Sequence, residues 1–448
     1  MAKTNLKPQA IYTHEGGRAT HINAELQLRR SVMACMLWEK EFYEDGQTIA
    51  ERIAAIIPSV APGTVAAIAV EARKRMKLRH VPLLLLREMA RLPKHRALVA
   101  TTLPLVIQRA DELAEFLALY WKDGRQPLSA QVKRGLASAF QHFTAYDLAK
   151  YNRDGAVKLR DVLFLCHAKP ANNDQAAVWK QLVDGTLPTP DTWEVALSSG
   201  GDKKAHWTRL LSENKLGALA LLRNLRNMAE VGIPEDDIRA ALTRLNAARV
   251  LPFRFIAAAR YAPHLEPELE AALFRSIAET PKLTGTTIVL IDVSDSMNGT
   301  VSDKSDMTRL DAACGVAMCA REICENTHIY SFSNNLIELP ARRGFALRDA
   351  IVNSQPHSNT YLGNAIAHLN TLAYDRLIVI TDEQTADKVP APTGKGYLIN
   401  VASAEHGVGY GAWRHIDGWS EAVLDYLRET EGAIPQDSAD AEREADTE

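Results

Sequence analysis

At 448 residues the chain is long enough for two or three domains, and 46% hydrophobic residues are ample for their cores. The formal net charge of −3 taken alone argues against a strongly basic nucleic-acid-binding protein, but the charge is divided unevenly. Residues 1–280 carry 39 Lys and Arg against 30 Asp and Glu, whereas residues 281–448 carry 13 against 25. This asymmetry indicates a polyanion-binding N-terminal part, although ordinary surface variation would also account for an excess of this size.

Neither secretion nor membrane insertion is expected. The first residues, MAKTNLKPQAIYTHEGG, hold no apolar segment of a secretory signal, and no apolar run approaches the ~20 residues of a membrane span. Five cysteines, an odd number in a long chain, favour a reducing compartment over a disulfide framework. We therefore expect a cytoplasmic protein.

Residues 1–280 are expected to form one helix after another. Apolar residues recur at three- and four-residue spacing in segments such as QTIAERIAAII, TVAAIAVEARKRMKL and LGALALLRNLRNMAEV. Short breakers separate these segments, among them Pro62-Gly63, Asp123-Gly124 and Asp184-Gly185. Helices of this length joined by tight turns are typical of a degenerate helical-pair solenoid, although no crisp repeat consensus is present.

The pattern changes after Pro281. Four β-rich runs, GTTIVLIDVS, THIYSFS, YDRLIVIT and GKGYLINVA, alternate with helical segments such as RLDAACGVAMCAREIC. Apolar strands that alternate with helices predict a parallel, doubly wound α/β sheet covered on both faces. We therefore expect two domains, residues 1–280 and 281–430, and a disordered acidic tail over residues 431–448.

Oxygen-bearing side chains stand at the ends of the predicted strands. Asp292 ends the first strand, Ser294 and Ser296 follow it in a DxSxS pattern, Thr360 precedes a later helix, and Asp382 ends another strand. Ligands of a doubly wound sheet bind at the carboxyl ends of its strands, so these five side chains are expected to meet there. Two carboxylates and three hydroxyls suit a divalent cation, Mg²⁺ above all. The alternative is that DxSxS forms only a turn and a helix cap.

Several long motifs resemble the TROVE-domain family, whose best-known member is the Ro autoantigen. They include THEGGRATHINAELQLRRSVMACMLWEKEFYEDG, LAKYNRDGAVKLRDVLFLCHAKP, RVLPFRFIAAARY and HGVGYGAWRHIDGWSEAV, and the similarity spans nearly the whole chain apart from the tail. The five residues at the strand ends are similar to the metal-ion-dependent adhesion site of von Willebrand factor A domains. The resemblance implies an all-α ring of HEAT-like helical repeats, with a Rossmann-like von Willebrand factor A domain bridging its ends.

The resemblance also implies partners. Members of the family bind small non-coding Y RNAs on the outer surface of the ring and accept single-stranded 3′ ends of defective RNAs in its hole. We therefore expect an RNA-binding scaffold, a monomeric ring, that acts in RNA quality control or small-RNA stabilisation. An exoribonuclease is expected as a further partner, and no membrane.

The family's Y RNA contacts cluster in the segment that ends FLCHAKP. His167 matches the RNA-contacting histidine and Lys150 a basic residue before it, whereas a second basic position holds Asp154, with Arg153 beside it. This departure counts against tight recognition of a typical Y RNA. Taken alone, His167 would rather be a core histidine bonded to the backbone; within the resemblance, we expect it to contact RNA together with Lys150 and Arg153.

Two further basic segments are candidates for the hole of the ring. Nine Lys and Arg lie between Arg73 and Arg96 against one Glu, and QVKRGL adds Lys133 and Arg134. Such runs are usually solvated helix faces, and we expect about half of these side chains to be so. The others would line the hole and hold the backbone of a strand.

No motif for catalysis stands out. The sequence contains no GxxxxGK[ST] phosphate loop, no HExxH pair and no GxSxG elbow, so we predict a binding protein rather than an enzyme. The alternative function is a cytosolic metal-site adaptor whose helical half docks a protein partner such as an AAA-type ATPase. RNA that copurifies with the protein would separate the two hypotheses.

Overall fold

The computed structural model divides into two compact units, each of which is described by itself. The helical unit comprises residues 23–35 and 47–210, and the mixed unit comprises residues 1–22, 36–46 and 211–448. The structure describes residues 10–34, 46–74, 76, 78–152, 155–189, 191–198, 202–247, 250, 252–278, 282–301, 306–402, 404–418, 423, 427 and 431. Within these residues, no helix has both the length and the apolar character to cross a membrane.

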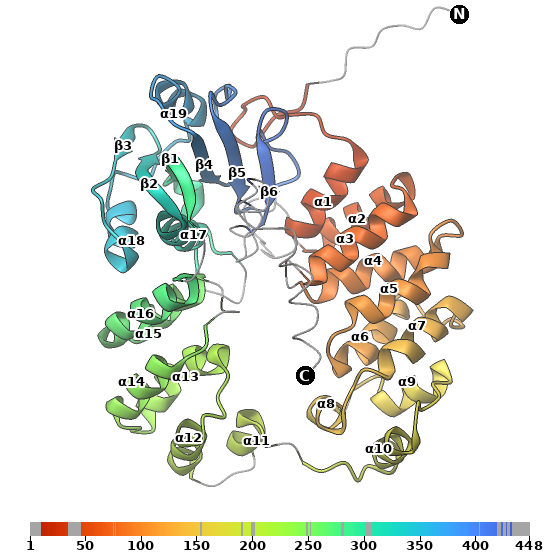
Figure 1. The fold of residues 1–448 in the computed structure, drawn as a ribbon. Helices are drawn as coiled ribbons and strands as arrows, with labels where there is room; N and C mark the ends of the chain where they lie inside the picture. The colour runs from red at the N-terminus through yellow and green to blue at the C-terminus, as the bar shows by residue number, and fades with distance from the viewer. Residues whose placement is uncertain are drawn as a thin grey trace, which may run out of the picture. The chain divides into compact units, whose positions relative to one another are not determined.

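The helical unit is a series of short helices (Figure 1). They are α1 (Ala24–Ala34), α2 (Gly46–Ile56), α3 (Pro62–Lys74), α4 (His80–Arg91), α5 (Val99–Val106), α6 (Ala110–Tyr120), α7 (Ala130–Phe140), α8 (Ala145–Tyr151), α9 (Leu159–Cys166), α10 (Asn173–Asp184), α11 (Trp193–Ser198) and α12 (Lys203–Ser212). Helices pack on near neighbours in the chain: α3 on α4 and α5, α4 on α6, α5 on α7, and α7 on α9. Such local packing is typical of HEAT-like helical repeats.

Polar caps fix where several of these helices begin and end. Ser129 accepts a hydrogen bond from the Val132 amide at the start of α7, and Thr144 and Asp147 form a capping box at the start of α8. Gly185 ends α10 in the left-handed conformation that glycine adopts at low cost. The predicted breaker Asp184-Gly185 therefore lies where a helix ends.

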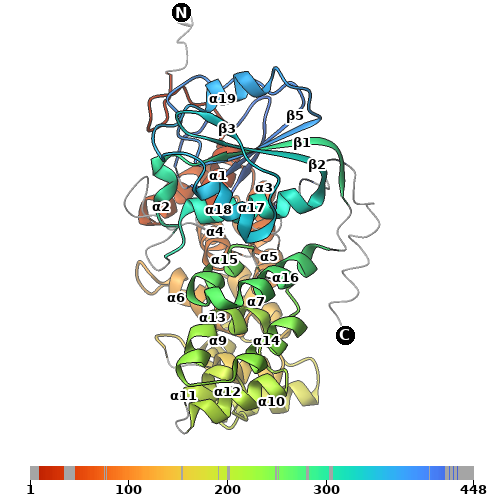
Figure 2. The same cartoon turned by 90° about the vertical axis from the view of Figure 1, so that its left-hand side faces the viewer.

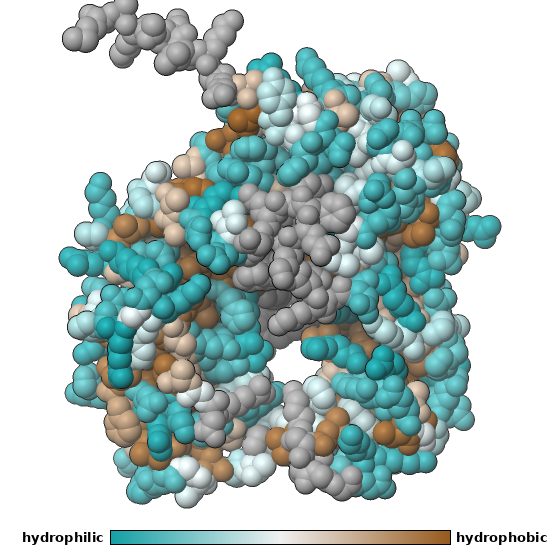
Figure 3. All heavy atoms as spheres, turned by 180° about the vertical axis from the view of Figure 1, so that it is seen from behind, coloured by the Kyte–Doolittle hydropathy of each residue, from teal (hydrophilic) through white to brown (hydrophobic). Residues whose placement is uncertain are grey.

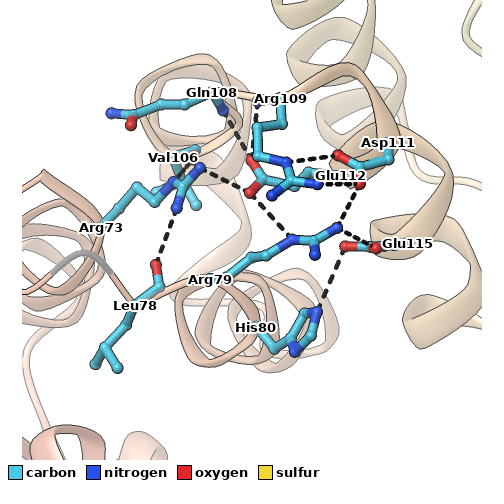
Figure 4. A network of polar contacts seen from close by, with 10 residues as sticks. All are labelled: Arg73, Leu78, Arg79, His80, Val106, Gln108, Arg109, Asp111, Glu112 and Glu115. Carbon is cyan, nitrogen blue, oxygen red and sulfur yellow. Dashed lines mark hydrogen bonds and ion pairs between the residues drawn. The ribbon is translucent and has the colours of Figure 1, made fainter. Parts of the chain in front are cut away.

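A network of ion pairs joins α3, α6 and the start of α4 (Figure 4). Arg73 is buried, and its guanidinium lies 2.7 Å from the carboxylate of the fully buried Glu112. Arg79 donates to Asp111 at 2.6 Å and also to Glu115. Burial lowers the pKa of Arg73 and raises the pKa of Glu112. Each charge is therefore costly to bury, and loss of Glu112 would leave the buried Arg73 without its carboxylate partner.

Much of the basic run between Arg73 and Arg96 is structural. Arg87 is buried and pairs with Asp123, and Arg91 reaches the same carboxylate at 3.0 Å. With Arg73 and Arg79 of Figure 4, four of the described basic side chains of this run are held in ion pairs between elements of this unit. The expectation that these side chains are solvated helix faces or lining for a strand is wrong for Arg73 and Arg87, because both are buried and each has a carboxylate partner within the fold.

The mixed unit contains further helices and a six-stranded sheet (Figure 1). Its helices are α13 (Ala218–Glu230), α14 (Glu235–Arg244), α15 (Pro252–Tyr261), α16 (Glu266–Ile277), α17 (Arg309–Ile323), α18 (Gly344–Val352) and α19 (Leu362–Leu369). Its strands are β1 (Leu283–Asp292), β2 (Cys324–Phe332), β3 (Leu336–Glu338), β4 (Arg376–Thr381), β5 (Lys395–Asn400) and β6 (Arg414–Asp417). The strand order is β3-β2-β1-β4-β5-β6, and only β3 is antiparallel to its neighbour.

The predicted fold class is confirmed. Among the residues that the structure describes, no strand precedes Leu283, and every strand lies in the one sheet. On the sheet, α17 packs against β1, β2 and β4, and Figure 2 shows it together with α18 from the side. A separate buried cluster packs α19 on alternate residues of β1, Ile288 and Leu290, and on β2, β4 and β5. Because helices cover these strands, their sequences are apolar throughout rather than alternating.

Helices α13 to α16 belong with the sheet rather than with the helices before them. α15 packs on α17, and α16 packs on α17 and α18. Arg260 of α15 donates to both carboxylate oxygens of Asp311 at 2.8 Å, and Arg348 of α18 lies 3.0 Å from Glu266 of α16. The change from helix to strand therefore lies near residue 281, but the compact units divide near residue 211.

The described cysteines are buried thiols. Burial raises the pKa of Cys166, Cys314, Cys319 and Cys324, so these thiols are packing residues of low reactivity. Cys35 lies outside the described residues.

The face drawn in Figure 3 is largely hydrophilic, and hydrophobic side chains form small separate patches on it.

Glu431 joins the end of the described chain to the sheet. Its carboxylate accepts hydrogen bonds from Arg376 Nε at 2.6 Å, from Lys395 Nζ at 2.8 Å and from the Tyr397 hydroxyl at 2.8 Å. The predicted acidic tail begins at this residue, and its other residues, 432–448, lie outside the described part of the chain.

Acid is expected to weaken this contact. Burial alone would raise the pKa of Glu431, but hydrogen bonds from Arg376, Lys395 and Tyr397 lower it to about 2, from an ordinary value of 4.5. A carboxylate with a lowered folded pKa stabilises the fold above its unfolded pKa, and this contribution is lost as the pH falls from about 4.5 toward about 2. We expect Glu431→Gln to lower the free energy of unfolding by roughly 1–3 kcal/mol at neutral pH and to flatten its fall in acid. Denaturant titrations at several pH values measure both effects. The control is Glu325→Gln, an exposed glutamate of β2, and equal pH profiles for the two variants would contradict the prediction.

Candidate functional site

The candidate metal residues lie on three loops at the carboxyl edge of the sheet. β1 ends at Asp292 and is followed by Ser294 and Ser296, β4 is followed directly by Asp382, and Thr360 stands just before α19. β1 and β4 are neighbours, and the chain continues from β1 to β2 on one side and from β4 to β5 on the other. This edge is therefore the switch point at which doubly wound sheets bind ligands.

Asp292 is fully buried beside a second carboxylate. One of its oxygens accepts the Ser294 amide at 2.9 Å, and the other accepts the Thr381 hydroxyl at 2.6 Å. The hydroxyl oxygens of Ser294 and Ser296 are 3.2 Å apart. Burial raises the pKa of Asp292 to about 7, and the negative charge of the buried Asp382 adds to the rise. Two carboxylates are thus held close together away from water, and a bound cation would relieve their repulsion.

Hydrogen bonds join the three loops to one another. The Asp295 amide donates to the Ser358 carbonyl at 2.9 Å, which ties the DxSxS loop to the loop of Thr360. The Thr360 carbonyl accepts the Thr385 hydroxyl at 3.0 Å and the Ala386 amide at 3.1 Å, both from the loop after β4. The backbone of Thr360 therefore lies between the other two loops, and the structure places all five predicted residues at one edge.

A buried arginine, which sequence reasoning missed, belongs to the same site. Arg309 is the first residue of α17, and its Nη1 donates to the Ser296 carbonyl at 2.5 Å. The same nitrogen lies 3.6 Å from a carboxylate oxygen of Asp382, and both side chains are fully buried. A capping box of Thr308 and Asp311 fixes the start of α17 and with it the place of Arg309. That box, visible as TRLD, is the only local signal for this residue.

The donors at this edge fit a hard divalent cation. Carboxylate and hydroxyl oxygens are available from the five predicted residues, and the guanidinium of Arg309 offsets only part of the negative charge. Oxygen ligands with room for water are what Mg²⁺ prefers. The chemistry of the residues is therefore compatible with the predicted ion, whose binding remains a prediction.

A segment from the start of the described chain packs on this edge. We call residues 10–20 the N-terminal segment. The Thr13 hydroxyl donates to the Thr385 carbonyl at 2.8 Å, and the Gly17 amide donates to the same oxygen at 2.9 Å. Because Thr385 also bonds to Thr360, a continuous chain of hydrogen bonds runs from the N-terminal segment to a candidate metal loop.

Gly17 allows this close approach. A Cβ at this position would lie 2.2 Å from the backbone oxygen of Thr385, and neither backbone can shift without breaking the contact. We expect Gly17→Ala to detach the N-terminal segment and to lower the free energy of unfolding by roughly 1–3 kcal/mol. Hydrogen exchange of the peptide that contains Gly17 measures the detachment. Gly63→Ala is the control, since its new Cβ meets nothing within 4 Å. If the segment in Gly17→Ala exchanges its amide hydrogens as slowly as in the wild type, the close contact at Gly17 is not needed to hold the segment in place.

The candidate RNA-binding residues lie in the helical unit, on helices supported by α6. The described ones are Lys133 and Arg134 in α7, Lys150 in α8 and His167 directly after α9. α6 packs against α7, α8 and α9, so the helices that carry these residues all contact the same helix. Arg153 and Asp154 lie outside the described residues.

His167 is exposed and ends α9 in the left-handed conformation, with φ 54°. Its amide donates to the Phe164 carbonyl at 3.3 Å, as is typical of a residue that closes a helix. The alternative that His167 is a core histidine is therefore wrong, and its ring is accessible to a ligand.

Exposed aromatic rings accompany these basic residues, and sequence reasoning missed them. Tyr146 of α8 is 51% exposed and Phe164 of α9 is 59% exposed. The Lys150 ammonium lies 5.7 Å from the ring centre of Tyr146 and 5.5 Å from that of Tyr151. Proteins that bind single-stranded nucleic acids combine such rings, which stack on bases, with cations that neutralise phosphates. For Phe164 the sequence did hold a signal: its place in the helical periodicity lies outside the buried face of α9.

Two family models match adjoining parts of the chain. Residues 179–290 match the TROVE domain model, and residues 286–394 match the Ro60 vWA domain model. The second range contains all five candidate metal residues. The candidate RNA-binding residues precede the first range.

Similar proteins are found both by fold and by sequence. The structure is similar to that of the Deinococcus radiodurans RO (RSR) protein, with a TM-score of 0.59 and 19% sequence identity over 90% of this chain and 98% of that chain. Telomerase protein component 1 of Rattus norvegicus and that of Mus musculus are 35% and 36% identical to this chain over 91 residues. That segment covers 19% of this chain and only 4% of either relative. Residues 179–394 of the chain thus match a TROVE domain followed by a Ro60-type von Willebrand factor A domain.

Proposed function

We propose that this protein binds RNA through the helical unit. The observation that carries the proposal is the set of exposed side chains Arg134, Tyr146, Phe164 and His167 on α7, α8 and α9 and at the end of α9, together with the half-buried Lys133 and Lys150. Cations there would neutralise phosphates, and the flat rings of Tyr146, Phe164 and His167 would stack on unpaired bases. The match of residues 179–290 to the TROVE domain and the likeness of fold to a RO protein support this assignment.

The RNA that we propose is a small non-coding RNA of the Y type or the single-stranded 3′ end of a defective RNA. The role would then be small-RNA stabilisation or RNA quality control in the cytoplasm, with an exoribonuclease as a further partner. Asp154 stands where the family pattern has a basic residue, which supports a broader choice of RNA than a typical Y RNA alone. Binding rather than catalysis is proposed for the whole chain.

The carboxyl edge of the sheet supports a second, separate role. We propose that Asp292 and Asp382, with the hydroxyls of Ser294, Ser296 and Thr360, hold Mg²⁺ there. When bound, the ion would supply a positive charge to which a carboxylate of a protein partner could bind. The observation in favour is the pair of buried carboxylates, of which Arg309 balances one. The protein could thus act as an adaptor, of the kind that serves an AAA-type ATPase, at this edge while the helical unit holds RNA.

Copurification tests the RNA proposal. The full chain, purified at low salt, is expected to carry RNA that raises the ratio of absorbance at 260 nm to that at 280 nm, and ribonuclease treatment should lower this ratio. Sequencing of the released RNA would identify its class. Protein free of nucleic acid that also fails to bind added small RNA or single strands would defeat the proposal and leave the adaptor role.

A further inference from the structure

A cavity in the mixed unit is lined by arginines. It has a volume of about 350 Å³ and lies among α13, α15 and the residues just before α17. Its charged lining residues are Arg223 and Arg226 from α13, Arg254 and Arg260 from α15, and Asp306. Four guanidinium groups against one carboxylate make this a strongly positive cavity, and none of these residues belongs to the candidate metal or RNA sites described above.

Neighbouring carboxylates partly neutralise Arg260 and Arg226. Arg260 donates to both oxygens of Asp311 at 2.8 Å and to the Asp306 carbonyl at 2.6 Å, which fixes it on the wall of the cavity. Arg226 lies 3.0 Å from Glu230 one turn further along α13, but both side chains are largely exposed, so that this pair is weak.

Arg223 and Arg254 lie close enough for the charge of one to act on the other. Burial lowers the pKa of Arg254, and the positive charge of Arg223 lowers it further. Arg223 is exposed and, among the residues that the structure describes, forms no ion pair with a carboxylate. An anion placed between these two groups would relieve their repulsion and would be held by planar, multidentate donors.

An aromatic ring stands at the same cavity. Tyr261 is 49% exposed, and its hydroxyl donates to the Asp306 carboxylate, which fixes the ring. The guanidinium carbon of Arg226 lies 5.9 Å from the ring centre. The cavity therefore combines cations that suit a phosphate with a half-exposed ring that suits a planar base. Its volume is within the usual range for small-molecule sites.

We propose that this arginine cavity binds one nucleotide, with the phosphate between Arg223 and Arg254 and the base against Tyr261. The nucleotide is either a free nucleoside monophosphate or one residue of a single-stranded RNA. If the nucleotide belongs to an RNA strand, the inference rests on the proposed function. The cavity would then add a nucleotide site in the mixed unit to the proposed RNA surface of the helical unit.

Calorimetry and fluorescence anisotropy on the full chain test the proposal. The probes are uridine monophosphate and a labelled oligouridylate that is too short to fold. We expect Arg223→Ala to weaken binding of at least one probe by about 10-fold and to lower the salt dependence of oligonucleotide binding by about 0.7, the value for one phosphate contact on a single strand. Tyr261→Leu should weaken the same probe by about 5- to 100-fold with an unchanged salt dependence, because stacking releases no counterion.

Matched variants separate this site from general effects of charge. Arg244→Ala removes an exposed arginine of α14 that does not line the cavity, and it should bind like the wild type. Arg223→Lys should keep the salt dependence while losing part of the affinity. Arg254 is left unchanged, because its partial burial makes a folding defect the expected result of replacing it. A 4-thiouridine-labelled oligonucleotide should crosslink to the tryptic peptide that begins at Tyr261.

The outcomes are distinct. Binding of both probes that depends on Arg223 indicates a site for free nucleotide, and binding of the oligonucleotide alone indicates a site for a strand. Wild-type affinity for both probes in Arg223→Ala and Tyr261→Leu overturns the arginine cavity, even when RNA binding through Lys150 is intact. Failure of the wild type to bind either probe also overturns it. The RNA proposal is judged separately, by binding of structured small RNA and its loss in Lys150→Ala.

Discussion

Asp292→Asn is expected to abolish the response of the protein to Mg²⁺. The substitution keeps the size of the side chain but removes one of the two buried carboxylates at the carboxyl edge. A ligand that binds only the folded state raises its stability by RT ln(1 + [L]/Kd), so the wild type should show a midpoint of thermal unfolding that rises with Mg²⁺ concentration. We expect the affinity of the variant for Mg²⁺ to fall by on the order of 100-fold, which removes most of that rise.

The same variant has a second, opposite effect that sharpens the test. Without Mg²⁺, Asp292→Asn should be more stable than the wild type at neutral pH, because it ends the repulsion between Asp292 and Asp382. Asp295→Asn is the matched control: it removes an exposed carboxylate three residues further along the same loop and should leave the Mg²⁺ response intact. If the unfolding midpoint of the wild type does not change with Mg²⁺ concentration, the metal proposal is wrong.

Lys133→Ala/Lys150→Ala is expected to weaken binding of single-stranded or small RNA by on the order of 100-fold at physiological salt. Each charge-assisted contact with a phosphate contributes roughly 1.5 kcal/mol, and two such contacts would be lost. Because phosphate contacts release counterions, the plot of log affinity against log salt should also flatten by about 1.4, twice the value for one contact on a single strand. Anisotropy titrations over a range of salt concentrations measure both quantities.

His167 requires a different substitution. Alanine would be strained at its left-handed backbone, whereas asparagine adopts that conformation readily, so that His167→Asn removes the ring and leaves the end of α9 intact. We expect it to reduce affinity without changing the salt dependence. Lys204→Ala, which removes an exposed lysine of α12, is the control for the double variant. RNA affinity that does not change with salt concentration, or that is unchanged in all of these variants, would show that RNA does not bind at these residues.

The fold class and the positions of the metal candidates could be predicted because their signals are local. Apolar runs that end in Asp292 and Asp382 predict strand ends, and the carboxyl ends of parallel strands share one edge. The ion-pair partners could not be predicted. Arg73 sits in a run that looks like a solvated helix face, but Glu112, its partner, lies 39 residues further along the chain, and periodicity carries no information about such partners.

The division into compact units was beyond sequence reasoning for a related reason. The helices α13 to α16 have the same periodicity as those before them, and only their packing on α17 and α18 assigns them to the mixed unit. Arg309 was missed because it follows no motif for a metal site. Its role depends on the Ser296 carbonyl and on Asp382, which tertiary structure brings to it.

The N-terminal segment has a consequence for the order of events during synthesis. Thr13 is synthesised 372 residues before Thr385, its hydrogen-bond partner. At ~5–20 residues per second, the segment waits about 20–70 s before it can pack. The helical unit, whose helices pack on near neighbours in the chain, can fold while it emerges. A nascent chain would thus present the proposed RNA-binding surface well before the sheet that follows it is complete.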